Sequence, residues 1–234
     1  MLLNLFRSGF DPLELIIDLF AMAFVVFCTM PVHEYAHALI ATKLGDQTPR
    51  LSGRLTLNPM AHISPLGAAM IFLVGFGYAK PVSVNPRNFK DPKKGMALTA
   101  IAGPVSNLIM AFIFLLLAQI VDLASNGQTV FFQKDGVIFA PQSLNIPFAV
   151  CMFLYYAGVI NINLAVFNLL PIPPLDGSRI LQLLIPAKYY YRVMQYERYI
   201  ILAVFFLLFT GILSYPISFI SNLILDLFMF FEKF

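Results

Sequence analysis

The sequence predicts an all-α polytopic membrane protein with about five or six transmembrane helices, one of which is a candidate re-entrant segment, and short β-strand segments near the functional side. Of its 234 residues, 59% are hydrophobic and only 12% are charged, whereas about a quarter of an ordinary soluble domain is charged. Two uncharged runs, residues 96–121 and 146–170, are each long enough to cross a bilayer. We therefore expect a single membrane-embedded domain over residues 1–234, with a core at about 20–180 and apolar C-terminal helices at 199–231.

The first helix is expected over residues 12–44. Pro31 lacks a backbone N–H and is expected to bend this helix, and Gly45 is a typical residue to follow a helix end. Glu14 and Asp18 lie four residues apart near the start, which we interpret as a polar entry end at the interface rather than a proton relay. We expect no cleavable signal peptide, because this first apolar run also holds the metal-binding motif described below.

The next segments alternate between polar and apolar stretches. Residues 46–62 are polar and rich in turn-forming residues, and we expect a short strand at 51–57 within them. The apolar run at 63–79 is barely long enough to span and contains several glycines, so a re-entrant segment and a full span both remain open. The basic loop at 80–95 is expected to contain an extended piece at 82–84.

The last quarter of the chain is punctuated by prolines. Residues 171–177 contain three prolines and are expected to form a rigid, non-helical break. The apolar stretch at 199–231 is interrupted at 214–216, which fits two short helices or one long span with a tail. Cys28 and Cys151 both lie in apolar runs, so we interpret them as buried hydrophobic residues rather than as a disulfide.

Basic residues predict the orientation in the membrane. Twelve of the 15 Lys and Arg residues fall in three loops, at 43–62, 80–95 and 171–198, whereas residues 122–145 contain only Lys134. Because Lys and Arg favour the cytoplasmic side, we expect a multi-pass protein of the cell membrane with these three loops in the cytoplasm. With the first two loops on one side, the apolar run between them must be re-entrant, and the functional site lies toward the cytoplasm.

A metal-binding motif, His33-Glu34-x-x-His37, lies in the last third of the first helix. Positions i and i+4 share one helix face, so the two histidines can hold one metal ion and Glu34 can stand beside it as a general base. Ionisable side chains inside a membrane segment are costly and usually mark function. Catalytic zinc generally takes three protein ligands and a water, so a third ligand is expected elsewhere in the chain.

Asp176 and His62 are the main candidates for the third ligand, ahead of Asp18 and Asp46. Asp176 follows three prolines and precedes Gly177, which favours a ligand held at a set angle. The alternative for Asp176 is that it caps the following helix. We interpret His62 first as a loop histidine that bonds the backbone, and second as a group near the mouth of the site.

Two asparagines are further candidates for the site. Asn107 lies four residues after Gly103, on the same face of the helix expected at 96–121. It either holds helices together or donates a hydrogen bond to a carbonyl oxygen that becomes negative during a reaction, and the residues alone favour neither role. Asn168 lies at the end of the next long helix, just before the proline-rich break, and is a secondary candidate.

Taken together, these residues resemble the site-2 protease family of intramembrane zinc metallopeptidases. The family pattern has three motifs, which match this sequence at His33–His37, Gly103–Asn107 and Asn168–Gly177. The resemblance covers residues from about 20 to 180 and is specific as a set. Many members also carry a PDZ or regulatory domain, and the short polar loops of this chain suggest a minimal member without either.

The resemblance implies a role for each main candidate residue. It implies that His33, His37 and Asp176 bind Zn²⁺, that Glu34 activates a water, and that Asn107 helps to hold the substrate. It also implies that the substrate is a transmembrane helix of another protein, cut within or near the bilayer in regulated intramembrane proteolysis. The expected partners are that substrate and the lipid bilayer, with no nucleic acid and an oligomeric state left open.

Two alternatives to a protease remain at this point. A membrane metal carrier or sensor would use the same three ligands but would not need Glu34. An inactive relative that only binds membrane helices would be expected to have lost Glu34 or one of the ligands, and all four residues are present.

Overall fold

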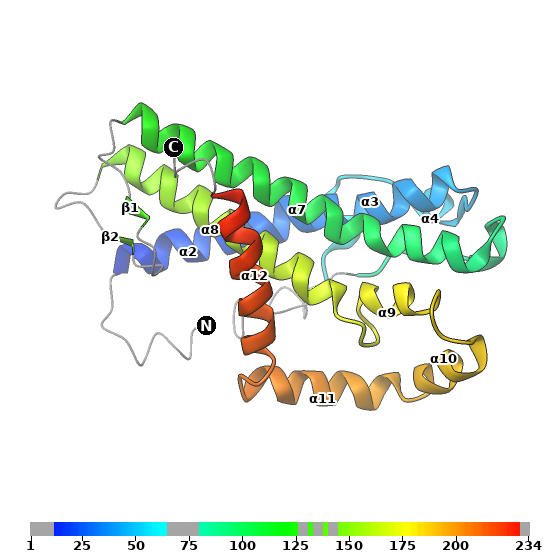
Figure 1. The fold of residues 1–234 in the computed structure, drawn as a ribbon. Coiled ribbons are helices and arrows are strands. Elements are labelled where there is room, and N and C mark those ends of the chain that lie inside the picture. Colours follow the sequence, from blue (N-terminus) through cyan, green and yellow to red (C-terminus); the bar gives the residue numbers. More distant parts are fainter. Residues whose placement is uncertain (1–11, 65–79, 126–130, 133–137, 140–144, 230–234) are drawn as a thin grey trace.

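The computed structural model describes residues 12–64, 80–125, 131–132, 138–139 and 145–229, and it shows a bundle of helices (Figure 1). The all-α fold class is confirmed for these residues. In chain order the elements are α2 (Pro12–Phe24), η1 (Val25–Thr29), α3 (Met30–Lys43), α4 (Thr48–Leu51), α5 (Pro59–His62), η2 (Pro86–Asn88), α7 (Pro92–Ala124), β1 (Phe131–Phe132), β2 (Ile138–Phe139), α8 (Ile146–Leu169), α9 (Asp176–Leu181), α10 (Ala187–Met194), α11 (Glu197–Phe209) and α12 (Ser214–Phe228).

The first long helix contains a change of helical winding just before the metal motif. Helices α2 and α3 are joined by η1, a π-helical segment in which the hydroxyl of Thr29 donates to the carbonyl of Val25 at 3.1 Å. Pro31, the second residue of α3, supplies no N–H to the preceding turn. π-helical segments inside α-helices often occur at functional sites, because they rotate the residues that follow. The expected end of this helix is confirmed, since Gly45 follows α3 with φ of +114°.

Helices α7 and α8 form the centre of the bundle and confirm the two spans expected there. The carboxylate of Asp91 accepts hydrogen bonds from two N–H groups in the first turn of α7, and the side chain of Asn145 caps α8 in the same way. Gly158 allows a close approach, because a Cβ there would lie 2.7 Å from the side chain of Leu115. The apolar cluster at this contact includes Ala111, Leu115, Ile162 and Val166.

The strands expected at 51–57 and 82–84 are wrong. The first segment instead continues from α4 into a turn at Gly53, where φ is +70°. A glycine in this left-handed conformation turns the chain and does not extend a strand. Residues 82–84 have no regular secondary structure, and no neighbouring described segment bonds to them as a ladder. Within the described residues, the only strands are β1 and β2, which pair antiparallel in the loop between α7 and α8.

The expected number of five or six spans is not supported. Three helical segments are long and apolar enough to cross a membrane, namely residues 16–43, α7 and α8, and the pair α11 and α12 makes up to four. That pair is bent by 74°, at a turn where Gly211 has φ of +79°. The interpretation of 199–231 as two short helices is therefore confirmed. Most of the 63–79 run, expected to be re-entrant, lies outside the described residues.

Helix α9 brings the segment after α8 back to the bundle. Figure 1 shows α9 near the end of the bundle where α3 and α4 lie, while β1 and β2 lie at the opposite end. Helix α9 packs against both α7 and α8. Figure 1 also shows α12 lying across α8, with α11 leading back toward α10. The result is that α3, α7 and α9, which are distant in sequence, meet at one end of the bundle.

Candidate metal centre

The two histidines of the motif lie on one face of α3 and point at the same spot. His33 and His37 are both 7% exposed, and their Nε2 atoms lie 3.0 Å apart. Their rings meet edge to face, with centroids 4.6 Å apart. Two Nε2 atoms this close suit a shared cation, since both offer lone pairs when the rings are neutral.

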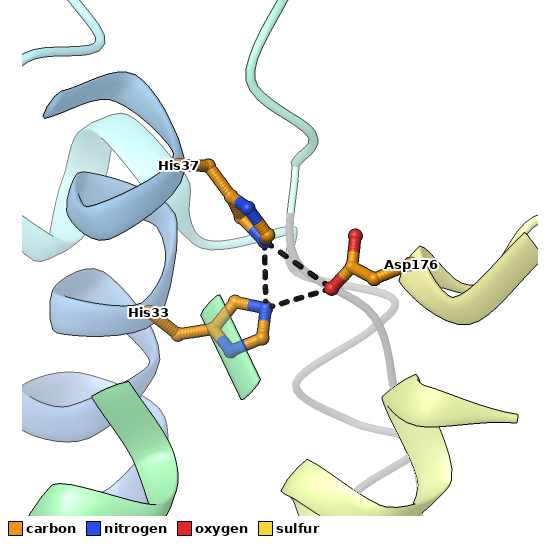
Figure 2. A group of neighbouring side chains, drawn as sticks. All are labelled: His33, His37 and Asp176. Atoms are coloured by element: carbon orange, nitrogen blue, oxygen red, sulfur yellow. Dashed lines mark hydrogen bonds and ion pairs between the residues drawn. The ribbon is translucent and has the colours of Figure 1, made fainter. Parts of the chain in front are cut away.

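Asp176 completes the group from the other side. Its Oδ2 lies 3.3 Å from Nε2 of His33 and 3.2 Å from Nε2 of His37. Figure 2 shows both rings and this carboxylate oxygen converging, while the second carboxylate oxygen points away. Asp176 is the first residue of α9 and Leu175 occupies the cap position, so Asp176 does not hold the capping place that the alternative interpretation gave it.

The missing side chain of Gly177 lets the start of α9, and with it Asp176, pack closely against the end of α8. A Cβ at position 177 would lie 2.2 Å from the carbonyl oxygen of Leu169 and 2.4 Å from that of Leu170. The start of α9 therefore rests directly on the last carbonyls of α8. The Ser178 hydroxyl also donates to the carbonyl of Leu175 at 2.7 Å, which stabilises the first turn of α9.

The three atoms fit a zinc ion. Zinc in proteins is usually tetrahedral, with His nitrogen and carboxylate oxygen at about 2.0–2.2 Å, so its ligand atoms lie about 3.3–3.5 Å apart. The separations of 3.0, 3.2 and 3.3 Å are close to that spacing and need only a small expansion. Two imidazoles and one carboxylate leave a fourth position free for a water, as catalytic zinc sites do.

Helix α7 orients one of the histidines. Nδ1 of His37 lies 2.7 Å from the carbonyl oxygen of Thr99, so Nδ1 carries the proton and donates it. Nε2 of His37, which faces Asp176, is then the nitrogen that would bind a metal ion. The corresponding Nδ1 of His33 is buried and has no hydrogen-bond partner in the described parts of the chain.

Electrostatics at Asp176 are consistent with this arrangement. Burial by itself raises the pKa of the Asp176 carboxyl, but the facing His37 and His33 lower it overall to well below its usual range. Asp176 is therefore an anion at neutral pH. An anionic oxygen next to two imidazole nitrogens is a ligand set that binds a divalent cation.

A cavity of about 600 Å³ opens next to the three ligand atoms. Glu34 lines it and is 8% exposed, so it belongs to the cavity wall and not to the outer surface of the bundle. Asn107 also lines it and makes no hydrogen bond within the portion of the chain that the structure describes. Asn168 lines the same cavity, and its amide donates to the carbonyl of Leu164 at 2.9 Å.

The remaining candidates lie away from the cavity. His62 is buried, its Nε2 lies 2.8 Å from the carbonyl oxygen of Thr56, and it is absent from the cavity wall, as the structural interpretation expects. Asp46 accepts hydrogen bonds from Thr48, Asn85 and Asn88, so it holds two loops together. Asp18 lies on α2 and does not belong to the group that can hold a metal.

Two residues of this site have no counterpart among the sequence-based candidates. Thr99 acts through its backbone carbonyl, which any residue type supplies, so no side-chain pattern marks it. Arg179 lines the cavity three residues after Asp176. Its i, i+3 spacing from a candidate ligand is a signal that the sequence did contain.

Comparison with known proteins identifies related sequences. Residues 20–211 match the profile of peptidase family M50. YwhC of Bacillus subtilis (strain 168) is 39% identical over 178 residues, which cover 76% of this chain and 75% of YwhC. Rip2 of Mycolicibacterium smegmatis is 26% identical, with 62% of this chain and 50% of Rip2 covered. MJ0392 of Methanocaldococcus jannaschii is 27% identical, with 71% of this chain and 35% of MJ0392 covered. The names of all three contain the words zinc metalloprotease, and no solved structure matches the chain significantly.

Proposed function

This chain belongs to peptidase family M50, the site-2 proteases, and from that premise we propose which bond it cuts and which residues carry out the reaction. It is a zinc metalloprotease of the membrane. We propose that its substrate is a transmembrane segment of another protein, hydrolysed within or near the bilayer. The observation that carries this proposal is the convergence of His33, His37 and Asp176 beside a buried cavity that Glu34 also lines.

His33, His37 and Asp176 are the proposed zinc ligands. A zinc ion bound there would supply Lewis-acid chemistry, lowering the pKa of a bound water to about 7 and polarising the carbonyl group of the substrate. Thr99 holds the His37 ring through its Nδ1, and Gly177 holds Asp176 against the end of α8. These supports keep the ligand atoms in place while the chain binds substrate.

Glu34 is the proposed general base and acid. Its carboxylate takes one proton from the attacking water as the C–O bond forms, and it then gives that proton to the amide nitrogen as the C–N bond breaks. Glu34 directly follows the proposed ligand His33 in α3, and this helix holds it at the cavity wall. Asn107 faces the same cavity with its side-chain amide free to donate to the carbonyl oxygen, which supports the second of its two interpretations.

The cavity suits a peptide taken from a membrane segment. Its wall is mostly apolar and includes Val82, Phe167 and Phe205. A substrate helix must unwind locally, because its carbonyl groups are otherwise bonded within the helix. The polar groups in the wall are then available to the exposed peptide bonds.

We also propose that the site faces the cytoplasm. The basic loops identified in the sequence surround α4, α9 and α10, which lie at the same end of the bundle in Figure 1. A cysteine introduced at Ser52 should then react with a membrane-impermeant maleimide only from the cytoplasmic side, and one at Ala124 only from the other side. If the maleimide reacted with both cysteines from the same side of the membrane, this orientation would be contradicted.

The direct test of the function compares Glu34→Gln with wild type. Both proteins should bind equal amounts of zinc, while cleavage of a single-span substrate in detergent should be lost in the variant, because Gln cannot accept the proton. Glu197→Gln is the matched control, since Glu197 lies at the start of α11 and outside the cavity wall. Cleavage that continues in Glu34→Gln, or no cleavage by wild type, would rule out the proposed reaction. The metal-carrier alternative predicts that Glu34→Gln changes nothing.

A further inference from the structure

Arg179 is the only lysine or arginine among the described residues that line the cavity. It lies on α9, three residues after Asp176, and its side chain is half-buried. The wall around the rest of the cavity is mostly apolar, with Ile201 and Leu208 of α11 among its residues. A half-buried guanidinium in such surroundings has fewer waters around it than one on an open surface.

No counter-ion for Arg179 is present in the described structure. The three ion pairs found there join His33 and His37 to Asp176 and Lys94 to Asp91, and none includes Arg179. The sequence of residues 65–79, which precedes the cavity-lining residues Val82 and Val84, contains no Asp or Glu. A partly buried charge without a partner is costly, and arginine is the side chain best suited to bind a carboxylate through two parallel hydrogen bonds.

The position of Arg179 relates it to the scissile bond. Side chains at i and i+3 of a helix lie about 5–6 Å apart at Cβ, so Arg179 and Asp176 share one face of α9. An extended peptide rises about 3.3 Å per residue. A substrate carboxylate that reached Arg179 would therefore belong to a residue within about two or three positions of the bond that is cut.

The charges of the cavity also favour an anionic group. Glu34 and Asp176 are the only carboxylates among the lining residues, and both are assigned to the reaction. With a divalent cation bound, these groups and Arg179 leave one net positive charge in the cavity. A neutral apolar peptide would leave this charge uncompensated.

We propose that Arg179 forms a subsite for a carboxylate of the substrate, close to the scissile bond, which rests on the proposed protease function. The carboxylate has two chemical sources. One is the side chain of an Asp or Glu within the substrate segment. The other is the free α-carboxylate of a substrate whose chain already ends near this position after an earlier cut.

The test uses the full-length, zinc-loaded protein in detergent with a single-span substrate. One Glu is moved through each position on both sides of the scissile bond and compared with Gln at the same position. At one position, wild type should prefer Glu over Gln by about ten- to a hundredfold in kcat/KM, mostly through KM, as expected for a charge-assisted hydrogen bond. A second series of substrates, whose chains end at that position with either a free α-carboxylate or an amide, separates the two sources. A preference for the free carboxylate in this series identifies the chain end as the group that Arg179 binds.

Variants of Arg179 then identify the cause of the preference. In Arg179→Met, the ratio of kcat/KM for the Glu and Gln substrates should fall to about one. In Arg179→Glu, a substrate with Lys at the same position should be cleaved better than the one with Glu, a reversal that loss of folding cannot produce. Arg192→Met is the matched control, because Arg192 lies exposed on α10 and should keep the wild-type ratio. Equal cleavage of Glu and Gln substrates at every position, or an unchanged ratio in Arg179→Met, would overturn the proposal.

A binding measurement separates this proposal from the protease function itself. In the Glu34→Gln background, a fluorescent peptide with the preferred Glu should bind about ten- to a hundredfold more tightly than its Gln counterpart, and Arg179→Met should remove that difference. If wild type cleaves nothing, the protease function fails, and the binding difference alone still decides the role of Arg179.

Discussion

Gly103 shows how closely two helices must approach for the metal centre to exist. A Cβ at this position of α7 would lie 2.3 Å from Nε2 of His37 and 2.6 Å from Cε1 of His33. The same helix supplies the Thr99 carbonyl that holds His37. The side-chain-free surface of Gly103 and the carbonyl one turn earlier thus position both rings.

The substitution Gly103→Ala should therefore weaken zinc binding more than it weakens the fold. The added methyl group must displace one or both imidazole rings, and losing the support of a metal ligand typically costs about 10- to 100-fold in affinity. Zinc affinity can be measured by competition with a chelator. The control is Gly158→Ala, whose methyl group meets only the Leu115 side chain and should lower thermal stability without changing zinc affinity. Equal zinc affinities for wild type and Gly103→Ala would contradict this role.

Asp46 is a second residue whose role follows from its contacts. Its carboxylate accepts hydrogen bonds from the Thr48 N–H and hydroxyl, from the Asn85 N–H, and from the Asn88 side chain. Burial raises the pKa of Asp46, but these hydrogen bonds lower it overall below its usual value. The ionised form therefore stabilises the fold at pH values above the ordinary Asp pKa, and that stabilisation is lost as pH falls through the lowered pKa.

The variant Asp46→Asn should be less stable than wild type by about 1–3 kcal/mol at neutral pH, because an amide group points an N–H donor at other donors. The difference should shrink at acid pH below the ordinary Asp pKa, because the stabilisation by the wild-type carboxylate is lost as pH falls toward its lowered pKa. Thermal unfolding in detergent at both pH values measures it. Asp91→Asn should change little, since Asn caps a helix about as well as Asp. A difference that stays the same at both pH values would argue against the carboxylate as its cause.

At the scale of elements, the stretch just before η2 lies along one side of the cavity. Val82 and Val84 line the cavity and are half-buried, whereas Ser83 between them is exposed. This alternation is typical of an extended chain, although the segment belongs to no sheet in the described structure. An unwound substrate could add to it as a strand, with backbone hydrogen bonds between the two chains.

Ser83→Pro tests this strand addition. Proline removes the N–H of residue 83 and one backbone hydrogen bond with it, so kcat/KM should fall about three- to tenfold. Ser83→Ala keeps the N–H and should cleave at the wild-type rate, and zinc content should be unchanged in both. Cleavage by Ser83→Pro that equals cleavage by Ser83→Ala would show that the substrate does not pair with this segment.

At the scale of the whole molecule, the sequence is informative where physical constraints are local. The i, i+4 spacing of His33 and His37, the length of the uncharged runs and the glycine after α3 each predict a feature that the structure shows. The fold of the C-terminal third is less predictable, because α11 is apolar on most faces and carries little periodicity that assigns a neighbour.

The errors have physical causes as well. The residues around Gly53 alternate like a strand, but a glycine with positive φ and the backbone bonds from Gly53 and Arg54 back to Arg50 and Pro49 turn the chain there instead. The role of Thr99 depends on a backbone carbonyl, which any residue type supplies, so no side-chain pattern marks it. Gly103 belongs to one of the motifs in the sequence, but its contact with both imidazole rings follows only from the fold. Asp176 was one of several open candidates from the residues alone, since only the folded chain brings it to the two histidines.

X-ray absorption at the zinc edge of the purified full-length protein tests the central claim most directly. The account predicts one zinc ion per chain, bound only by nitrogen and oxygen at about 2.0–2.2 Å, with the signature of two imidazoles. Asp176→Ala should lose the carboxylate contribution and most of the zinc. A spectrum with sulfur ligands, or with fewer than two imidazoles, would contradict the site formed by His33, His37 and Asp176.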